Sequence, residues 1–441
     1  MQPEGALFPA VKRIGRHANR TGDRQDSGID SHRRCQGANG GHLKMRRAII
    51  IVIDALGVGA LPDAADYGDI PECNTLGNVA RASQGLRLPH LGALGLGNIT
   101  EVQGVPPVAQ PLASYGRMME VSKGKDTTTG HWEIAGLVLD QPFQVYPHGF
   151  PAELLDRFVA ETDCGGILGN CPASGTEIIE RFDPRHVATG FPIVYTSADS
   201  VFQVACNTDV VPLETLYGWC QIARGLLTDD YNVSRVIARP YCRTEMGLKR
   251  LSGARRDLAV TPPKPTVLNR IADRGGLVLG IGKIVDIFVG SGITHSVHTN
   301  GNAEGLQLTL QAIRNQLDLT SLRESRTTTD ESECQLIFTN LVDTDALYGH
   351  RNDPVGYGRA LEEIDRAIPE MLNHLTDDDL LVITGDHGCD PTVPGTDHTR
   401  EYVPLLVYQP HQAARSLGTC TSFAWIADTA ADWLLRLRSA P

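Results

Sequence analysis

Residues 48–54 read AIIIVID, a run of apolar and mostly β-branched residues that ends in an aspartate. Two further runs have the same form, CQLIFTNLVD at 334–343 and DLLVITGD at 379–386. Uninterrupted apolar runs of this length are typical of strands that are buried on both faces of a parallel sheet. Between the last two runs, residues 354–375 carry apolar side chains at helical spacing, as a crossover helix between parallel strands does. The pattern predicts an α/β fold with a central, mostly parallel sheet flanked by helices.

The middle of the chain has a different sequence pattern, with short strand-like pieces such as SRVIARP at 234–240. It ends at TPPKPT, residues 261–266, a proline-rich joint of the kind found where a chain passes between domains. We therefore expect a core domain that is interrupted by a smaller α+β cap domain. The expected boundaries are 45–141 for the first part of the core, 142–262 for the cap and 263–441 for the second part of the core.

The first 44 residues lack sustained apolar periodicity and carry eight Lys or Arg against four acidic residues. We predict that residues 1–44 form a disordered N-terminal extension, and that the folded part begins near Met45. Whether this extension is present in the mature protein is not readable from the sequence. Without it, 32 basic residues face 48 acidic ones, so residues 45–441 carry −16, against −12 for the whole chain of 441 residues. That balance argues against a protein that coats nucleic acid or anionic membrane.

Apolar runs and cysteines bear on where the protein works. The apolar run at 48–53 is far shorter than the ~20 residues that a transmembrane helix needs. The ten cysteines are scattered and include no CxxC pair, which favours reduced thiols over a disulfide framework. These features predict a cytoplasmic protein with no membrane partner.

Acidic residues and histidines gather behind the predicted strands. In open α/β sheets, ligands bind outside the carboxyl ends of the strands, so residues there converge on one place. Carboxylates mixed with imidazoles suit divalent Mn, Zn or Fe, and six such ligands divide into two sites of three. Three carboxylates and two divalent ions would leave the site at about +1, which attracts an anion such as a phosphate. The six candidates are Asp54, Asp345, His350, Asp386, His387 and His398.

A nucleophile for phosphoryl transfer is offered by the loop KGKDTTTGHWEIAG at 123–136. It contains three consecutive threonines, and coordination to a dication makes a threonine alcohol a competent nucleophile. The residues themselves do not distinguish among Thr127, Thr128 and Thr129.

Long motifs in this chain resemble the phosphopentomutase family of the alkaline phosphatase superfamily. The resemblance runs in family order from Met45 to near the C-terminus, and it leaves the first 44 residues without a counterpart. The motifs that carry it are IDALGVGALPDAADYGD (53–69), GKDTTTGHWEIAG (124–136), PIVYTSADSVFQ (192–203), NLVDTDALYGHRNDPVGYG (340–358) and GDHGCDPTVPGTDHTREYVPLL (385–406).

The resemblance implies an alkaline-phosphatase-like core and an isomerase that interconverts α-D-ribose 1-phosphate and ribose 5-phosphate, and the deoxyribose pair, in nucleoside salvage. It implies an intermolecular phosphotransfer through a phosphothreonine at Thr127, two Mn²⁺ ions, and glucose 1,6-bisphosphate or ribose 1,5-bisphosphate as the priming activator. One ion would be held by Asp345, His350 and His398, and the other by Asp54, Asp386 and His387. Sugar phosphates would be the partners of a monomeric enzyme. The implied substrate contacts are Ser197, Asp199, Val201, Arg239, Lys283 and a second phosphate-binding arginine at Arg255 or Arg256.

One departure from the family pattern lies beside the metal ligands, and several alternatives stay open. Where the family commonly has asparagine, this chain has Cys389, either as a spectator or as a thiol that makes the site sensitive to oxidation or zinc. A phosphatase or a phosphoglycerate-type mutase on the same metal core is the enzymatic alternative, although the phosphoglycerate mutases of this superfamily use serine. A catalytically inactive metal-binding scaffold is the alternative from another class. The preference for ribose or deoxyribose, the ion that is loaded, the resting state of Thr127 and the oligomeric state are not readable from the sequence.

Overall fold

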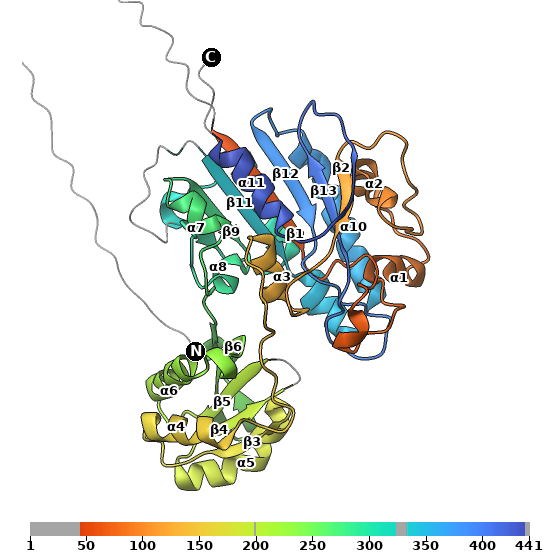
Figure 1. Cartoon of the computed structure of the whole chain (residues 1–441). Helices are drawn as coiled ribbons and strands as arrows, with labels where there is room; N and C mark the ends of the chain where they lie inside the picture. The colour runs from red at the N-terminus through yellow and green to blue at the C-terminus, as the bar shows by residue number, and fades with distance from the viewer. Residues whose placement is uncertain (1–44, 198–199, 323–331, 333, 437–441) are drawn as a thin grey trace, which may run out of the picture. The chain divides into compact units, whose positions relative to one another are not determined.

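A computed structural model of the chain describes residues 45–197, 200–322, 332 and 334–436. The predicted disorder of residues 1–44 therefore lies outside the described residues. The described strands form two sheets, one of eight strands and one of six (Figure 1). No described helix is both long enough and apolar enough to cross a membrane.

The larger sheet has the order β10-β9-β11-β1-β12-β13-β2-β14. Its neighbours from β10 to β12 run parallel, β13 is antiparallel to both β12 and β2, and β14 is parallel to β2. The predicted strand runs at 48–54, 334–343 and 379–386 become its three adjacent central strands. The bounds are β1 (Arg46–Ile53), β2 (Ser114–Met118), β9 (Leu277–Ile281), β10 (His295–Val297), β11 (Cys334–Leu341), β12 (Asp379–Thr384), β13 (Val403–Tyr408) and β14 (Ser416–Cys420).

Helices cover both faces of this sheet because alternate strand residues point to opposite sides. Ile49, Ile51 and Ile53 of β1 pack in one cluster with α1, α2, α9 and α10. Ala48, Ile50 and Val52 pack in a second cluster with α3, α7, α8 and α11. The bounds are α1 (Thr75–Ala82), α2 (Pro89–Leu94), α3 (Thr127–Ile134), α7 (Val267–Ala272), α8 (Ile284–Ile287), α9 (Asn302–Ile313), α10 (Pro354–Leu372) and α11 (Trp425–Leu435). The predicted α/β class, with a mostly parallel sheet between helices, is confirmed.

The smaller sheet has the order β3-β4-β5-β6-β7, with β8 also paired to β6, and it mixes parallel and antiparallel pairs. Its strands all fall between β2 and β9 of the larger sheet, inside the range predicted for the cap. Helices α4 and α6 pack in one cluster with Val194, Phe202 and Val204, and α5 packs in another with Ile193 and Tyr195. The predicted boundaries of the domains stay a prediction. The bounds are β3 (Leu168–Pro172), β4 (Ile193–Thr196), β5 (Val201–Asn207), β6 (Arg235–Thr244), β7 (Gly247–Arg250), β8 (Arg256–Ala259), α4 (Ala152–Thr162), α5 (Gly175–Thr189) and α6 (Leu213–Leu226).

Candidate metal centre

Three aspartates follow the three central parallel strands of the larger sheet. Asp54 comes directly after β1, and Asp386 comes two residues after β12 ends. Asp345 lies in a short π-helical turn, Thr344–Tyr348, that follows β11. Because β11, β1 and β12 are parallel neighbours, their carboxyl ends share one edge of the sheet, and the three side chains converge there.

A first group of possible ligands consists of Asp54, Asp386 and His387, whose donor atoms all lie within 4.8 Å of one another. His387 Nε2 is 3.4 Å from Asp54 Oδ1 and 3.4 Å from Asp386 Oδ2. All three residues are fully buried, with no more than 1% of their surface exposed. These are the three residues that the family resemblance assigns to one ion.

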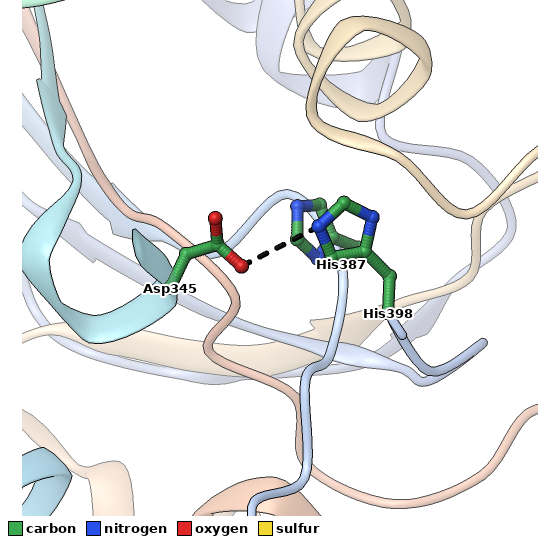
Figure 2. Close-up of side chains that lie close together, drawn as sticks. All are labelled: Asp345, His387 and His398. Carbon is green, nitrogen blue, oxygen red and sulfur yellow. Dashed lines mark ion pairs between the residues drawn. The ribbon is translucent and has the colours of Figure 1, made fainter. Parts of the chain in front are cut away.

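A second group surrounds Asp345. Its Oδ1 atom lies 3.4 Å from Nε2 of both His350 and His398, and these two nitrogens are 3.1 Å apart. Figure 2 shows the Asp345 carboxylate facing the ring of His398, with His387 beside it. The donor atoms of Asp345, His387 and His398 also lie within 4.8 Å of one another, so His387 belongs to both groups. The structure thus brings all six predicted ligands into one cluster.

The cluster contains buried carboxylate oxygens that lack hydrogen-bond partners. These atoms are Asp54 Oδ1, Asp345 Oδ1 and Asp386 Oδ2. An unpaired polar atom in a protein interior costs free energy, and an ionised carboxylate costs most. Three such oxygens, each aimed at imidazole nitrogens, fit the binding of cations by this cluster.

The charges within the cluster also shift the pKa values of its own members. Burial alone would lower the pKa of His387, but the carboxylates of Asp386, Asp54 and Asp345 raise it well above its usual value. Burial would raise the pKa of Asp345, yet the close approach of His398 Nε2, at 3.4 Å, and the charges of His398, His387 and His350 lower it to about 2. The carboxylates therefore draw positive charge into the cluster, as a proton on His387 or as a bound cation.

Of the three consecutive threonines, Thr127 is the one that the structure places against this cluster. Its Oγ1 lies 3.1 Å from Nε2 of His387. Asp126 caps helix α3, and its Oδ1 accepts hydrogen bonds from the N–H groups of Thr128 and Thr129. The Thr129 hydroxyl donates to Asp126 Oδ2 at 2.6 Å, which leaves that hydroxyl engaged elsewhere. The cap thereby sets Thr127 as the first residue of the helix, with its hydroxyl directed at the cluster.

Two buried polar residues support the site and were missed by the sequence reasoning. His131 stands one turn after Thr127, with Nδ1 2.9 Å from the Thr127 carbonyl oxygen and 3.0 Å from Asp386 Oδ2. Asn340 Nδ2 lies 3.2 Å from His131 Nε2 and donates to Asp54 Oδ2 at 2.9 Å. The signals were present: His131 is four residues from Thr127, hence on the same helix face, and Asn340 is a polar residue one position before the end of a mostly apolar strand.

Arg400 and Lys125, also missed, fasten the loop that carries Thr127. Arg400 is 1% exposed and Nη1 donates to Glu120 Oε2 at 2.8 Å and to the carbonyl oxygens of Ser122 and Gly124 at 2.8 and 2.6 Å. Lys125 Nζ lies 2.9 Å from Asp69 Oδ1 and 3.2 Å from Asp397 Oδ2. Asp397 and Arg400 lie on either side of His398 in the sequence. The contacts of Lys125 with Asp397, and of Arg400 with residues 120–124, therefore connect a predicted metal ligand to the threonine loop.

Most predicted substrate contacts lie on elements of the smaller sheet. Ser197 follows β4, Val201 begins β5, and Arg239 in β6 donates from Nε to Gln203 Oε1 at 2.6 Å. Arg255 forms a two-pronged ion pair with Asp257. Asp199 lies outside the described residues.

Two further residues from the substrate prediction have distinct settings. Arg256 stacks its guanidinium 3.8 Å above the ring of Tyr217. Lys283 is exposed at the start of α8, in the larger sheet's half of the chain. The structure groups Thr127 with the six predicted metal ligands, while the substrate roles of these other residues stay predictions.

Comparisons with known proteins place the chain among metalloenzymes. The sequence model of the Metalloenzyme superfamily matches residues 46–436. A protein named phosphopentomutase from Anaeromyxobacter dehalogenans strain 2CP-1 is 53% identical over 388 residues, covering 88% of this chain and 95% of its own length. Another of that name, from Acetivibrio thermocellus, is 52% identical over 392 residues, covering 88% of this chain and 96% of its own. Among solved structures, the PH0037 protein from Pyrococcus horikoshii is 15% identical, with a TM-score of 0.44, over 90% of this chain and 99% of that one.

Proposed function

The chain belongs to the phosphopentomutase family of the Metalloenzyme superfamily, and we propose that it interconverts α-D-ribose 1-phosphate with ribose 5-phosphate, and the corresponding deoxyribose phosphates. Family membership makes it a mutase, that is an isomerase, with a metal cofactor. The proposal has four parts: the sugar substrates, the phosphothreonine, the pairing of two ions and their identity as Mn²⁺.

One observation carries the proposal: the Thr127 hydroxyl lies 3.1 Å from His387, inside a cluster with three unpaired carboxylate oxygens. This combination supplies a nucleophile and a place for cations next to it. The N-terminus of α3 adds partial positive charge at Thr127, which favours a phosphate there over a neutral hydroxyl.

In this proposal the six ligands hold two ions. Asp345, His350 and His398 hold one Mn²⁺, and Asp54, Asp386 and His387 hold the other. Bound ions would lower the pKa of the Thr127 hydroxyl and offset the negative charge of the phosphoryl group in transfer. Asn340 keeps the Asp54 carboxylate in place by donating a hydrogen bond to it at 2.9 Å. His131 does the same for Asp386, whose Oδ2 lies 3.0 Å from its Nδ1.

The proposed cycle exchanges phosphoryl groups without net transfer to water. The bond from phosphorus to Thr127 Oγ1 breaks as a bond forms to a hydroxyl oxygen of the pentose phosphate, whose proton is released. The resulting bisphosphate reorients in the site. The bond from its other phosphorus to the sugar oxygen then breaks as a new bond forms to Thr127 Oγ1. Glucose 1,6-bisphosphate or ribose 1,5-bisphosphate primes an unphosphorylated Thr127. Water must be kept out, since phospho-Thr127 would otherwise hydrolyse.

Substrate binding is assigned to residues of the smaller sheet and to Lys283. The assigned residues are Ser197, Asp199, Val201, Arg239, Arg255 and Lys283. Arginine forks suit the phosphate that the pentose substrate already carries, and the partners they now have, Gln203 and Asp257, are oxygen acceptors that a phosphate could replace.

The setting that we propose is cytoplasmic nucleoside salvage, by a monomer whose partners are sugar phosphates. The net charge of −12 supports this against a nucleic-acid partner. Nine cysteines in the described part of the chain are free thiols, as expected in a reducing compartment.

The test is a coupled assay of ribose 1-phosphate conversion with Mn²⁺, with and without glucose 1,6-bisphosphate. Thr127→Ala should abolish conversion and the incorporation of phosphate into the protein while the ions stay bound. Thr128→Ala is the matched control, because only its main-chain N–H has a role in the cap, and it should retain most activity. Mutase activity in Thr127→Ala would refute the assignment, and steady phosphate release without a priming bisphosphate would favour the phosphatase alternative.

A further inference from the structure

Cys389 belongs to a third group of possible metal ligands. Its Sγ atom, a carboxylate oxygen of Asp345 and a ring nitrogen of His350 all lie within 4.8 Å of one another. Cys389 is 1% exposed, and of the nine cysteines in the described residues it alone is part of such a group. The thiol thus stands beside the ion site that the proposed function assigns to Asp345, His350 and His398.

The surrounding backbone holds this thiol in place. Gly388 and Thr399 exchange two main-chain hydrogen bonds, at 3.0 and 2.7 Å, and so fix the segments of Cys389 and His398 side by side. The N–H of Cys389 donates to Thr75 Oγ1 at 3.2 Å. A side-chain Cβ at position 349 would come within 2.8 Å of Sγ, so Gly349 provides the space that the sulfur occupies.

An independent observation indicates that this group needs a cation. Asp345 is 6% exposed, and its Oδ1 atom has no hydrogen-bond partner. The Sγ atom has only a weak contact, 3.7 Å from the carbonyl oxygen of Asp397. A carboxylate, an imidazole and a thiol form a donor set that zinc accepts, and a thiolate discriminates against the harder Mn²⁺.

We propose that Cys389 is a further metal ligand, through which this site binds a soft divalent cation such as Zn²⁺ in preference to Mn²⁺. The inference rests on the metal centre of the proposed function and concerns only one of its two ions. Sulfur would bind as thiolate, with the thiol proton released to solvent.

A consequence for activity follows from counting ligands. Asp345, His350 and Cys389 supply three grouped donors, and His398, whose Nε2 lies 3.1 Å from that of His350, would have to supply the fourth donor of a closed four-coordinate zinc shell, whereas a catalytic ion keeps an open position for substrate. Zinc bound in this way holds the mutase in an inactive state, and Mn²⁺ bound without the sulfur leaves it active.

Cobalt provides a readout that does not depend on activity, because Co²⁺ bound to a thiolate absorbs in the near ultraviolet by sulfur-to-metal charge transfer. Co²⁺ added to the metal-free full-length protein should produce this band. Cys389→Ser should lose the band, and Cys73→Ser, a control cysteine that is 2% exposed and outside every ligand group, should keep it. Cys389→Ser should also lower the affinity for Zn²⁺ at least about tenfold and leave the affinity for Mn²⁺ nearly unchanged.

The outcomes separate this inference from the proposed function. Co²⁺ bound in full stoichiometry without the band, or an unchanged Zn²⁺ affinity in Cys389→Ser, would overturn the role of the sulfur and leave the mutase assignment intact. Failure of the protein to bind any of the three ions would overturn the metal centre and this inference with it. Thermal unfolding of each variant shows whether the serine substitutions leave the fold unchanged.

Discussion

The two sheets carry their polar side chains in different states. At the carboxyl edge of the larger sheet, oxygens of Asp54, Asp345 and Asp386 are buried without hydrogen-bond partners. In the smaller sheet, Arg239 is bonded to Gln203 and Arg255 to Asp257. In the first arrangement carboxylate oxygens lack a donor, whereas in the second each arginine already has an oxygen acceptor. The difference indicates that the edge of the larger sheet suits bound cations, while these arginines of the smaller sheet have partners within their own part of the chain.

The largest expected effect comes from removing a carboxylate of the cluster. Asp54→Asn should lower turnover by about 10³-fold, because an ion that stabilises the transferring phosphoryl group contributes several kcal/mol. Metal analysis should show the loss of one of the two proposed ions. Asp183→Asn is the counterpart beside the smaller sheet, because Asp183 in α5 is 1% exposed but accepts a hydrogen bond from Tyr241 of β6. If both variants retained the same metal content, the contrast between the sheets would be wrong.

Two arginines sharpen the comparison through stability. Arg400→Met leaves the carboxylate of Glu120, which is 3% exposed, buried without its cationic partner, and should cost about 3–5 kcal/mol in the free energy of unfolding. Arg243→Met in the smaller sheet removes a partner that is itself 61% exposed, and the buried Asp183 keeps its hydrogen bond from Tyr241, so the cost should be smaller, about 1–2 kcal/mol. Urea unfolding at neutral pH measures both differences.

The pH dependence of the Arg400 effect has a defined sign. Burial raises the pKa of Glu120 well above its usual value, although the charge of Arg400 opposes this. A carboxyl group with a raised pKa in the folded state destabilises the fold when ionised; this penalty shrinks as the pH falls below the folded-state pKa and is gone below the unfolded-state pKa. The deficit of Arg400→Met should therefore shrink on acidification. A deficit that grew instead would show that Glu120 is not the source of the loss.

Removal of the ions should act on one sheet more than on the other. If each ion is present at 100 to 1,000 times its Kd, chelation should lower stability by about 3–4 kcal/mol for each ion removed. Hydrogen exchange should accelerate at the ends of β1 and β12, residues 52–54 and 384–387, which carry the ligands. Exchange in β5, residues 201–207, should change little. Equal acceleration in both segments would mean that the ions stabilise the protein as a whole rather than the edge of one sheet.

The sequence predicted the larger sheet well because its signals are local and strong. Runs such as 48–54 and 379–386 are apolar throughout, and each ends in the acidic residue that the fold then places at the sheet edge. The antiparallel pairings of β13 with β12 and β2 carry no such signal, since strand direction depends on contacts between distant segments. The same holds for the choice among Thr127, Thr128 and Thr129, which is decided by the cap at Asp126 and by the position of His387.

The supporting residues escaped prediction for a related reason. Arg400 and Asn340 act through partners that are 280 and 286 residues away in the chain, Glu120 and Asp54. A single sequence does not reveal which buried polar residue satisfies which other, because that depends on the packed structure. Substrate contacts in the smaller sheet are harder to predict from the sequence. Arg239 and Arg255 bond to residues of their own sheet, and no cluster of carboxylates and imidazoles marks them as a site.

The smallest effect separates two buried histidines with nearly the same bonds. His131 and His186 are both fully buried, each has Nδ1 within 2.9 Å of a carbonyl oxygen, and each has Nε2 facing a nitrogen donor. Only His131 also lies beside a predicted metal ligand, Asp386, at 3.0 Å. His131→Gln should weaken ion binding by about 10–100-fold, and His131→Asn, whose amide can occupy the place of Nδ1, should weaken it less. His186→Gln should lower the free energy of unfolding about as much as His131→Gln does, but it should not change the ion affinity. Equal ion affinities in the two glutamine variants would show that His131 acts by packing alone.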